Sequence, residues 1–438
     1  MLTQTPLRQQ LLALRHSPCD GFIRLRNTFA VHSFPGWLRA QSLYPRIYWH
    51  GRGPDRPEYA TLGCIETLTD PAEIRRRDEQ MPTRGDSPRY FGGQAFDPAA
   101  PGWPGFGPCR FVLPRVELVR RGQSVQLCLN LWLRPDNREA ELAAALAALE
   151  QLRPEQPLPS LDPVDYRRRD RPGRRTWRAL VERVTAPDRL ARTPKVVLSR
   201  RSRLYTETSV DPWRMLAGWA GREPDCFHFG FEFTPGQAFI GCSPERLYRR
   251  EGRRLQTEAL AGTVRRTGDE ETDAALAASL LADHKNGHEN HLVQTDILAR
   301  LAPLADRLQR GEPRVIPLRL LQHLKRDIGA RLKAPVRDWQ LLAALHPTPA
   351  VGGTPRPAAL AFLQAHEPYR RGWYAGACGL LSRDTAELAV AIRCARIGPG
   401  AVDLFAGAGI VAGSTAAAEW AELDHKLASV LTLLREGG

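Results

Sequence analysis

The sequence predicts a mixed α+β protein built on antiparallel sheets, and two kinds of pattern support this prediction. Apolar residues alternate with other residues in 116–131 and in 227–241, and each segment contains a tight glycine turn, which is typical of a β-hairpin. Apolar residues at helical spacing recur in 142–152 and 177–184. Hairpins with helices between them favour antiparallel sheets over the strand–helix alternation of a parallel sheet.

The chain divides into three stretches. Residues 1–85 show little periodicity, because Pro and Gly interrupt the apolar runs, and we interpret them as an N-terminal part of the fold. Residues 86–175 contain the first hairpin, the 142–152 helix and, in 153–175, a Pro- and Arg-rich stretch that we interpret as a solvated connection. Residues 176–438 form the C-terminal core, and we expect the three stretches to make one compact unit.

The later elements follow from the same patterns of alternation and helical spacing. They are a short buried strand at 195–198, helices within 273–309 and 318–333, strands at 388–393 and 402–405 on either side of the turn Gly398-Pro399-Gly400, and a last amphipathic helix from about 415 to 435.

The composition indicates a globular protein. Of 438 residues, 42% are hydrophobic, which is enough to bury a sizeable core. No run approaches the ~18 apolar residues of a membrane span, and the N-terminal segment lacks a clear cleavage site for secretion. The eight cysteines are scattered singly and form no CxxC pair, so we expect reduced thiols in a cytoplasmic protein.

The net charge of +14 reflects 62 Lys and Arg against 48 Asp and Glu. Clustered cations can serve a nucleic acid partner, but the basic residues are spread along the chain, and the densest cluster, 166–175, lies in the Pro-rich stretch. We therefore expect no nucleic acid, membrane or obligate protein partner. The positive field gives weak support to an anionic small-molecule substrate.

Two helices carry candidate chemistry. In the last helix Glu419, Glu422 and Lys426 share one face, which alone is more typical of a solvated surface than of a site. The helix around 284–291 is rich in histidine, but a zinc protease motif needs Glu directly after the first His, where Lys285 stands. Glutamates from two helices would instead suit Mg²⁺, which prefers oxygen ligands.

The glycine-rich segment 407–413 follows a predicted strand and precedes the last helix. Alone it is similar to a dinucleotide-binding turn, in which glycines let the backbone approach an anion. The chain after it is too short for the rest of such a unit. Close approach of the backbone to a carboxylate fits this segment better.

Several motifs, taken together and in order, resemble one known family. They are RYFGGQAFD (89–97), KVVLSR (195–200), FIGCSPERL (239–247), TEALAGT (257–263), KNGHEN (285–290), HPTPAVGGTPR (346–356), YAGACGLL (374–381), AIRCARI (391–397), FAGAGIVAGS (405–414) and EWAELDHK (419–426). This pattern is similar to the chorismate-binding core of anthranilate, aminodeoxychorismate, salicylate and isochorismate synthases, over roughly residues 85–435. The resemblance implies the fold of the aminodeoxychorismate synthase and anthranilate synthase component I type, with sheets at the centre and helices outside.

The resemblance also implies roles for single residues. Lys195 would be the general base that activates water for attack at C2 of chorismate, and Glu245 the general acid that protonates the departing C4 hydroxyl. Glu289 and Glu422 would bind Mg²⁺, with Glu419 assisting. The remaining implied substrate contacts are Arg393 and Lys426 for carboxylates, backbone N–H groups of Gly407 and Gly409, and pocket residues Gly262, Thr263, His346, Thr348 and Tyr374.

For some of these residues a structural role competes with the implied one. Lys195 could be a surface lysine at a strand end. His346 and Tyr374 could be core residues with a satisfied polar tip. Arg393 closes an apolar strand, so a role with an anionic partner is the more attractive interpretation.

Position 261 separates the members of this family. Members that aminate C4 carry a nucleophilic lysine there, whereas this chain has Ala261. Lys195 and the motif TEALAGT, which includes Glu258, resemble the corresponding residues of the water-using enzymes, in particular the isochorismate synthases of menaquinone biosynthesis. Glu258 could have a structural rather than a catalytic role.

The resemblance thus implies a Mg²⁺-dependent isomerase that converts chorismate to isochorismate. The main alternative is a salicylate synthase, which shares the same residues and then eliminates pyruvate. An anthranilate synthase component I and a catalytically silent chorismate binder are less favoured, because a binder needs neither Lys195 nor Glu245.

Overall fold

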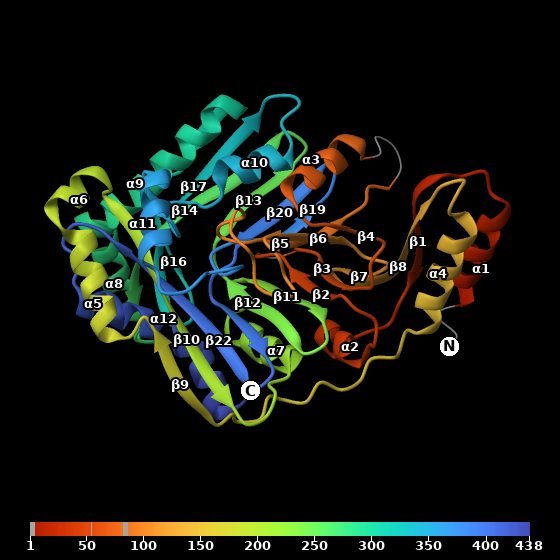
Figure 1. The fold of residues 1–438 in the computed structure, drawn as a ribbon, viewed down its shortest axis with the longest axis horizontal. Helices are drawn as coiled ribbons and strands as arrows, with labels where there is room; N and C mark the ends of the chain where they lie inside the picture. The colour runs from red at the N-terminus through yellow and green to blue at the C-terminus, as the bar shows by residue number, and fades with distance from the viewer. Residues whose placement is uncertain (1–4, 54, 82–85) are drawn as a thin grey trace.

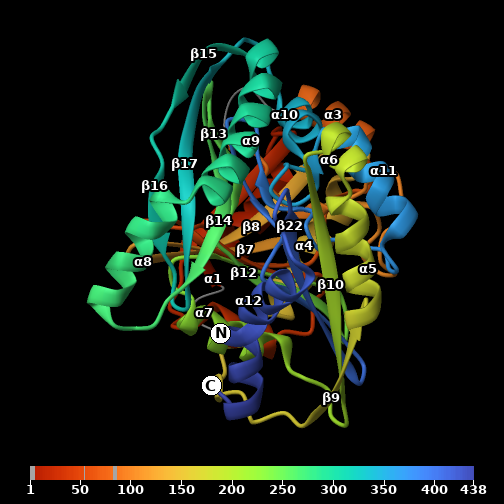
Figure 2. The same ribbon diagram turned by 90° about the vertical axis from the view of Figure 1, so that its left-hand side faces the viewer.

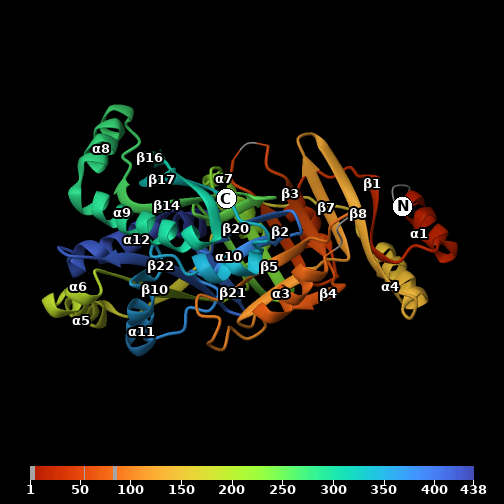
Figure 3. The same cartoon turned by 90° about the horizontal axis from the view of Figure 1, so that it is seen from above.

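The strands of the protein form two antiparallel sheets around one hydrophobic core (Figure 1). The computed structural model describes residues 5–53, 55–81 and 86–438, and within these one sheet has twelve strands and the other ten. Helices lie on the outside and at both ends of the elongated molecule (Figure 3). This confirms the predicted α+β class. The predicted boundary at residue 85 lies outside the described residues.

The larger sheet joins strands from both halves of the chain. From edge to edge it contains β1 (Gly21–Thr28), β8 (Ser124–Leu133), β7 (Val116–Arg121), β3 (Glu58–Leu62), β2 (Arg46–His50), β11 (Phe227–Thr234), β12 (Gln237–Ser243), β21 (Cys394–Gly398), β22 (Ala401–Ile410), β10 (Lys195–Thr206) and β18 (Gly353–Thr354). A further strand, β9 (Tyr166–Arg171), pairs with the second part of β10.

The smaller sheet is built in the same way. Its order is β15 (Ala305–Arg310), β17 (Leu321–Leu332), β14 (Arg254–Arg265), β13 (Arg246–Glu251), β20 (Thr385–Val390), β19 (Ala377–Leu381), β5 (Tyr90–Gln94), β6 (Cys109–Leu113) and β4 (Glu66–Leu68), and β16 (Arg314–Pro317) also pairs with β17.

The helices differ widely in length. They are α1 (Thr5–Ala13), α2 (Phe34–Ala40), α3 (Pro71–Gln80), α4 (Arg138–Glu150), α5 (Arg174–Thr185), α6 (Pro187–Arg192), α7 (Pro212–Arg222), α8 (Glu270–Ala282), α9 (His284–Leu301), α10 (Asp338–Leu345), α11 (Arg356–His366) and α12 (Ala416–Glu436), with short 3₁₀ turns at Leu14–His16 and Ala302–Leu304. In the part of the chain that the structure describes, no helix has the length and apolar character needed to cross a membrane.

The strongest sequence patterns are confirmed as elements. The two predicted hairpins are β7–β8 and β11–β12, and the predicted helices near 142–152, 177–184 and 415–435 are α4, α5 and α12. The strand predicted at 195–198 is the start of β10, which continues to Thr206 because β22 pairs with β10 from Val196 to Tyr205 and β9 pairs with its second part.

The prediction of a helix at 318–333 is wrong. This segment is the strand β17, which pairs with β14 on one side and with β15 and β16 on the other. Leu321, Leu324 and Ile328 have helical spacing, but strand pairing on both sides overrides this local pattern. Similarly, the helical region predicted up to 309 ends at a 3₁₀ turn containing Pro303, beyond which β15 begins.

The Arg-rich stretch is only in part the predicted solvated connection. Residues 166–171 form β9, an edge strand whose side chains alternate between exposed and half-buried positions. Long charged side chains suit such an edge because they remain solvated while the backbone pairs. Arg167, for example, packs its guanidinium over the ring of Tyr205 on β10.

The C-terminal glycines and strands also differ from the prediction. Gly407 and Gly409 lie inside β22 rather than in a turn between a strand and a helix. The strands β20 and β22 belong to different sheets, and the Gly398-Pro399-Gly400 turn instead connects β21 to β22. Local pattern identifies the strands but not their partners, which depend on non-local pairing.

Helices α9 and α12, which lie at the same end of the molecule, each have a side-chain cap at the N-terminus. Asp283 caps α9 by accepting a hydrogen bond from the N–H of Asn286, and Thr415 caps α12 by accepting one from the N–H of Ala418. Helix α9 packs on β14 and β17, whereas α12 packs on β22 and α5. Figure 2 shows α12 lying between the β14–β17 layer and the β9–β10–β22 layer.

Candidate active site

A pocket opens between these two layers, and most of the predicted site residues line it. Its walls come from β10, β14, β17 and β22, from the helices α9 and α12, and from the connection between β12 and β13. The predicted residues that line it are Glu245, Gly262, Thr263, Glu289, Tyr374, Arg393, Gly407, Gly409, Glu419, Glu422 and Lys426.

Lys195 is the first residue of β10, and its side chain is fully buried next to Glu289, a residue that lines this pocket. Its Nζ lies 2.9 Å from Oε1 of Glu289 on α9, as an ion pair whose angles are not those of a hydrogen bond. Gly409 leaves the room for this pair, because a Cβ there would lie 2.4 Å from Oε1 of Glu289 and 3.1 Å from Cε of Lys195. The lysine and the carboxylate are therefore packed against a glycine.

The last helix presents its acidic face to the same pocket. Glu422 pairs with Lys426 at 2.5 Å, and Glu419 pairs with Lys285 of α9 at 3.1 Å. Burial and the charge of Glu422 raise the pKa of Glu419. Burial alone would raise the pKa of Glu422 too, but Lys426 and Lys285 hold it below its usual range. Each glutamate thus has a lysine partner here, and the helix face is not a solvated surface.

Glu245 lies in the turn between β12 and β13 and is 3% exposed. The turn is fixed on one side, where the N–H of Val390 donates to the carbonyl oxygen of Glu245 at 3.0 Å. Burial, followed by the charge of Glu258, raises the pKa of Glu245 to about 8, against the opposing charges of Lys195 and Lys426. A carboxyl group with this pKa holds its proton at neutral pH and can donate it.

The backbone of β22 offers N–H groups to the pocket. The N–H groups of Val197 and Ser199 donate to acceptors on the side of β10 away from β22. Directly opposed residues in an antiparallel pair turn their N–H groups the same way relative to the partner strand, so those of Gly409 and Gly407 point away from β10. Strand β21 pairs only with the first part of β22 and leaves this stretch uncovered. The Nζ of Lys426 donates to the carbonyl oxygen of Gly407 at 2.8 Å.

Polar side chains complete the opposite wall. Nη2 of Arg393 lies 3.4 Å from Nε2 of His323, whose Nδ1 is 2.9 Å from the hydroxyl of Thr263. Burial and the charges of Arg393 and Lys426 keep the pKa of His323 well below its usual value, so this ring is neutral. The hydroxyl of Tyr374 approaches β22 so closely that a Cβ at Gly407 would lie 2.7 Å from it.

Three predicted residues, Lys195, His346 and Thr348, are not among the residues that line this pocket, although Lys195 contacts Glu289, which does line it. His346 is buried, its Nε2 lies 3.2 Å from the carbonyl oxygen of Ala95, and burial lowers its pKa to about 4. Thr348 is buried in a turn where its carbonyl oxygen accepts hydrogen bonds from Val351 and Gly352. For His346, these contacts match the structural alternative, which is a buried core residue rather than a pocket residue.

Sequence reasoning missed three charged or polar lining residues, His323, Lys285 and Asn286. His323 was missed because its segment was interpreted as a helix, and in β17 its side chain faces Thr263 of β14. Lys285 is part of the motif at 285–290, but local spacing gives no indication that it pairs with Glu419 of another helix.

The glutamates lack the arrangement of a complete metal cage. Among residues 5–53, 55–81 and 86–438, no three His, Cys, Asp or Glu side chains are grouped closely enough to hold a metal ion by themselves. Carboxylates from α9 and α12 nevertheless line one pocket and are matched by lysines. A hard cation that keeps several waters needs only one or two of them.

Comparison with known proteins identifies relatives of similar length and fold. The family model described as "Chorismate binding enzyme" matches residues 64–435. The chain is 38% identical to the isochorismate synthase MenF of Escherichia coli over 91% of its length and 90% of that protein. The solved structure of the menaquinone-specific isochorismate synthase from Escherichia coli superimposes with a TM-score of 0.89, at 35% identity, and covers 99% of this chain and 100% of that one.

A more distant structure shares the fold alone. Anthranilate synthase component I from Streptococcus pneumoniae has a TM-score of 0.69 and 20% identity, and covers 95% of this chain and 93% of that one. The family match includes the smaller sheet, the larger sheet except β1, β2 and β3, and every residue of the pocket described above. The chain therefore belongs to the chorismate-binding enzymes.

Proposed function

We propose that the protein is an isochorismate synthase of the menaquinone type, which converts chorismate reversibly to isochorismate. The observation that carries the proposal is a buried lysine, Lys195, close to a buried carboxyl group with a raised pKa, Glu245. Lys195 pairs with Glu289 of the pocket, and its charge acts on Glu245. A hydroxyl exchange at two carbons needs both a base and an acid. The strong similarity to isochorismate synthases over nearly the whole chain supports the same reaction.

The chain's own residues account for the proton transfers. Lys195 takes a proton from a water molecule, which adds at C2 of chorismate as the double bonds shift. Glu245 gives its proton to the C4 hydroxyl, which departs as water. One water enters and one leaves, so the product is an isomer of the substrate. The raised pKa of Glu245, at about 8, supports its role as the acid.

Chorismate carries two carboxylates, and the pocket offers cationic partners for them. Arg393 and Lys426 line it, and the N–H groups of Gly407 and Gly409 face the same space. Ala261 also lines the pocket and is small and apolar, where C4-aminating relatives carry a lysine. These contacts favour an anionic substrate and water, rather than an amine, as the nucleophile.

Magnesium is the proposed cofactor, and the residues present fit it. Glu289 and Glu422 would hold the ion, with Glu419 beside them, and the substrate and water would complete the set. The charge of Glu422 raises the pKa of Glu419 after burial, which is a repulsion that a cation relieves. When bound, Mg²⁺ would neutralise the negative charge of a substrate carboxylate.

We further propose a cytoplasmic location and chorismate as the one partner that the pocket serves. All eight cysteines are free, and six are buried, which suits a reducing compartment. The excess of positive charge is explained in this proposal by an anionic metabolite rather than by a nucleic acid.

The experiment incubates purified protein with chorismate and Mg²⁺ and separates the products by liquid chromatography. We expect isochorismate as the sole product, with rates reduced by about 10²- to 10⁴-fold in Lys195→Ala and Glu245→Gln and lost with EDTA. Matched controls are Lys333→Ala and Glu150→Gln, which change the same residue types at exposed positions.

Other products would contradict the proposal in defined ways. Salicylate with pyruvate would identify a salicylate synthase, and anthranilate formed with ammonia would identify the component I activity. Binding of chorismate without turnover in any condition would identify a silent binder.

A further inference from the structure

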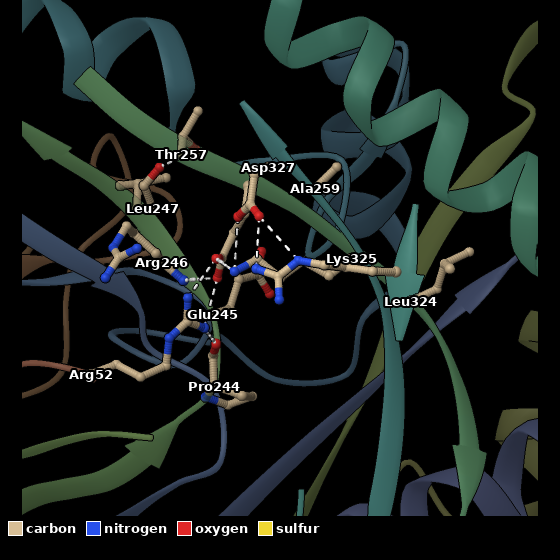
Figure 4. Close-up of polar contacts among 12 residues, drawn as sticks. Arg52, Pro244, Glu245, Arg246, Leu247, Thr257, Ala259, Leu324, Lys325 and Asp327 are labelled. Carbon is tan, nitrogen blue, oxygen red and sulfur yellow. Dashed lines mark hydrogen bonds and ion pairs between the residues drawn. The ribbon is translucent and has the colours of Figure 1, made fainter. Parts of the chain in front are cut away.

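Next to the turn that contains Glu245 lies a second buried glutamate. Glu258 of β14 is 2% exposed and does not line the pocket. Arg52 donates to both of its oxygens, to Oε1 at 2.9 Å and to Oε2 at 2.5 Å, and Nζ of Lys325 lies 2.9 Å from Oε2. Figure 4 shows Arg52, Lys325 and Asp327 around Glu245. Lys325 is shared with Asp327, at 2.9 Å. This cluster belongs to β14, β17 and the connection after β2.

Glu258 and Arg52 form hydrogen bonds with the backbone of the residues directly after and before Glu245. Oε1 of Glu258 accepts a hydrogen bond from the N–H of Arg246 at 2.8 Å, directly after Glu245. Arg52 donates a hydrogen bond to the carbonyl oxygen of Pro244, directly before it. Because the two peptide groups that flank Glu245 are both bound, the direction of its side chain depends on this pair.

On this basis we propose that Glu258 is a positioning residue, which fixes the turn of Glu245 and keeps that side chain in its proton-bearing form through its own negative charge. The inference rests on the proposed function for its meaning in catalysis, but not for its measurement. Glu258 touches neither the pocket nor, in this proposal, the substrate. It acts only through Glu245.

The charges around Glu258 make it a permanent anion. Burial alone would raise its pKa, but Arg52, Lys325 and Arg246 hold the pKa at about 2. Its charge is, after burial, the largest influence that raises the pKa of Glu245 to about 8. Without it, the cations Arg52 and Lys325 would remain beside Glu245 without their shared partner. Each would favour the ionised form of Glu245.

Other charged groups surround Glu245 and oppose Glu258. Those that lower the pKa of Glu245 are Lys195 on β10, Lys426 on α12 and Arg52 after β2. The further charged groups at the pocket are Lys285, Glu289, Arg393, Glu419 and Glu422. Glu258 opposes these cations, so removing its charge should lower the pKa of Glu245.

Two substitutions separate charge from geometry. Glu258→Gln keeps an oxygen that can accept from Arg246 but removes the charge, and we expect the alkaline limb of the kcat–pH profile to move by about one pH unit or more towards acid. Glu258→Asp keeps the charge but shortens the reach to Arg246 and Arg52, and we expect kcat to fall about tenfold while the limb stays in place. Asp327→Asn is the matched control, because it removes a negative charge beside Lys325 at a residue that does not contact the Glu245 turn.

A second readout does not depend on turnover. In protein labelled with ¹³C at the glutamate carboxyl groups, the resonance absent from Glu245→Gln reports the titration of Glu245 directly. We expect its midpoint at about 8 in the unaltered chain and at lower pH in Glu258→Gln. If Glu258→Gln does not fold, Glu258→Asp still tests the positioning role, because we expect its kcat to fall while the midpoint of Glu245 stays at about 8; an unchanged kcat would overturn that role.

The outcomes distinguish this inference from the proposed function. An unmoved carboxyl titration in Glu258→Gln, or a shift equally large in Asp327→Asn or in Glu258→Asp, would overturn the positioning role. Absence of isochorismate from the unaltered chain would overturn the proposed function and leave the carboxyl titration as a full test of the inference.

Discussion

At the scale of single residues, the geometry of the pocket depends on Gly409. This residue stands on β22 opposite Val197, and its missing side chain makes room for the contact between Lys195 and Glu289. A Cβ at 2.4 Å from a carboxylate oxygen is closer than non-bonded atoms allow, so Glu289 would have to move. The proposed base and a proposed metal ligand would then lose their arrangement together.

The corresponding prediction concerns Gly409→Ala. We expect kcat to fall by about 10²-fold or more, because small displacements of reacting groups are costly, while the melting temperature changes little. Gly398→Ala is the control, since a Cβ there has no atom within 4 Å among the described residues. Full activity of Gly409→Ala would show that the position of Glu289 does not matter for the reaction.

At the scale of elements, helix α12 is held to β10 by one buried arginine. Arg200 is 0% exposed, its Nη2 donates to Oδ1 of Asp424 on α12 at 2.6 Å, and its guanidinium lies 4.3 Å from the centre of the Trp420 ring. Arg168 of β9 donates to the same oxygen at 3.1 Å. This contact places the acidic face of α12 against the pocket.

For this contact we predict the effect of Asp424→Asn on stability. The substitution leaves Arg200 buried with only its longer ion pair, to Asp170 at 3.8 Å, which costs about 1–3 kcal/mol in the free energy of unfolding, measured by urea denaturation. Asp188→Asn is the control, because its ion pair with Arg192 is mostly exposed and contributes little. Equal midpoints for the two variants would mean that Asp424 does not hold the helix.

At the scale of the whole molecule, both sheets combine strands from distant parts of the chain. In the larger sheet β2 pairs with β11, and in the smaller sheet β5 pairs with β19. Cutting the chain at residue 175 would therefore expose strand edges in both sheets. Unpaired edges next to a buried core favour aggregation.

We accordingly predict that residues 176–438 do not fold alone, although they contain the predicted catalytic core. Expressed by themselves they should lack the cooperative thermal unfolding and the near-ultraviolet circular dichroism of the full chain. Co-refolding with residues 1–175 is the matched control and should restore both signals. A fragment that unfolds cooperatively and turns over chorismate would contradict the one-unit prediction.

The sequence by itself was sufficient for the elements with strong local patterns and for the family. Alternation in 116–131 and 227–241 predicted two hairpins, and a helical stripe predicted α12, because side-chain period reflects local backbone geometry. The ordered motifs predicted the residues that meet at the pocket, including Glu245 and Glu289, since such motifs carry the site itself.

Only the tertiary structure decided which of these groups face one another. It made residues 321–332 a strand and thereby brought His323 into the pocket, and it left His346 outside. It also placed Glu258 next to the turn of Glu245, through contacts with Arg52 that span some 200 positions of sequence. Spacing along the chain carries no information about such contacts, because strand pairing and the burial of charge depend on partners that are distant in sequence.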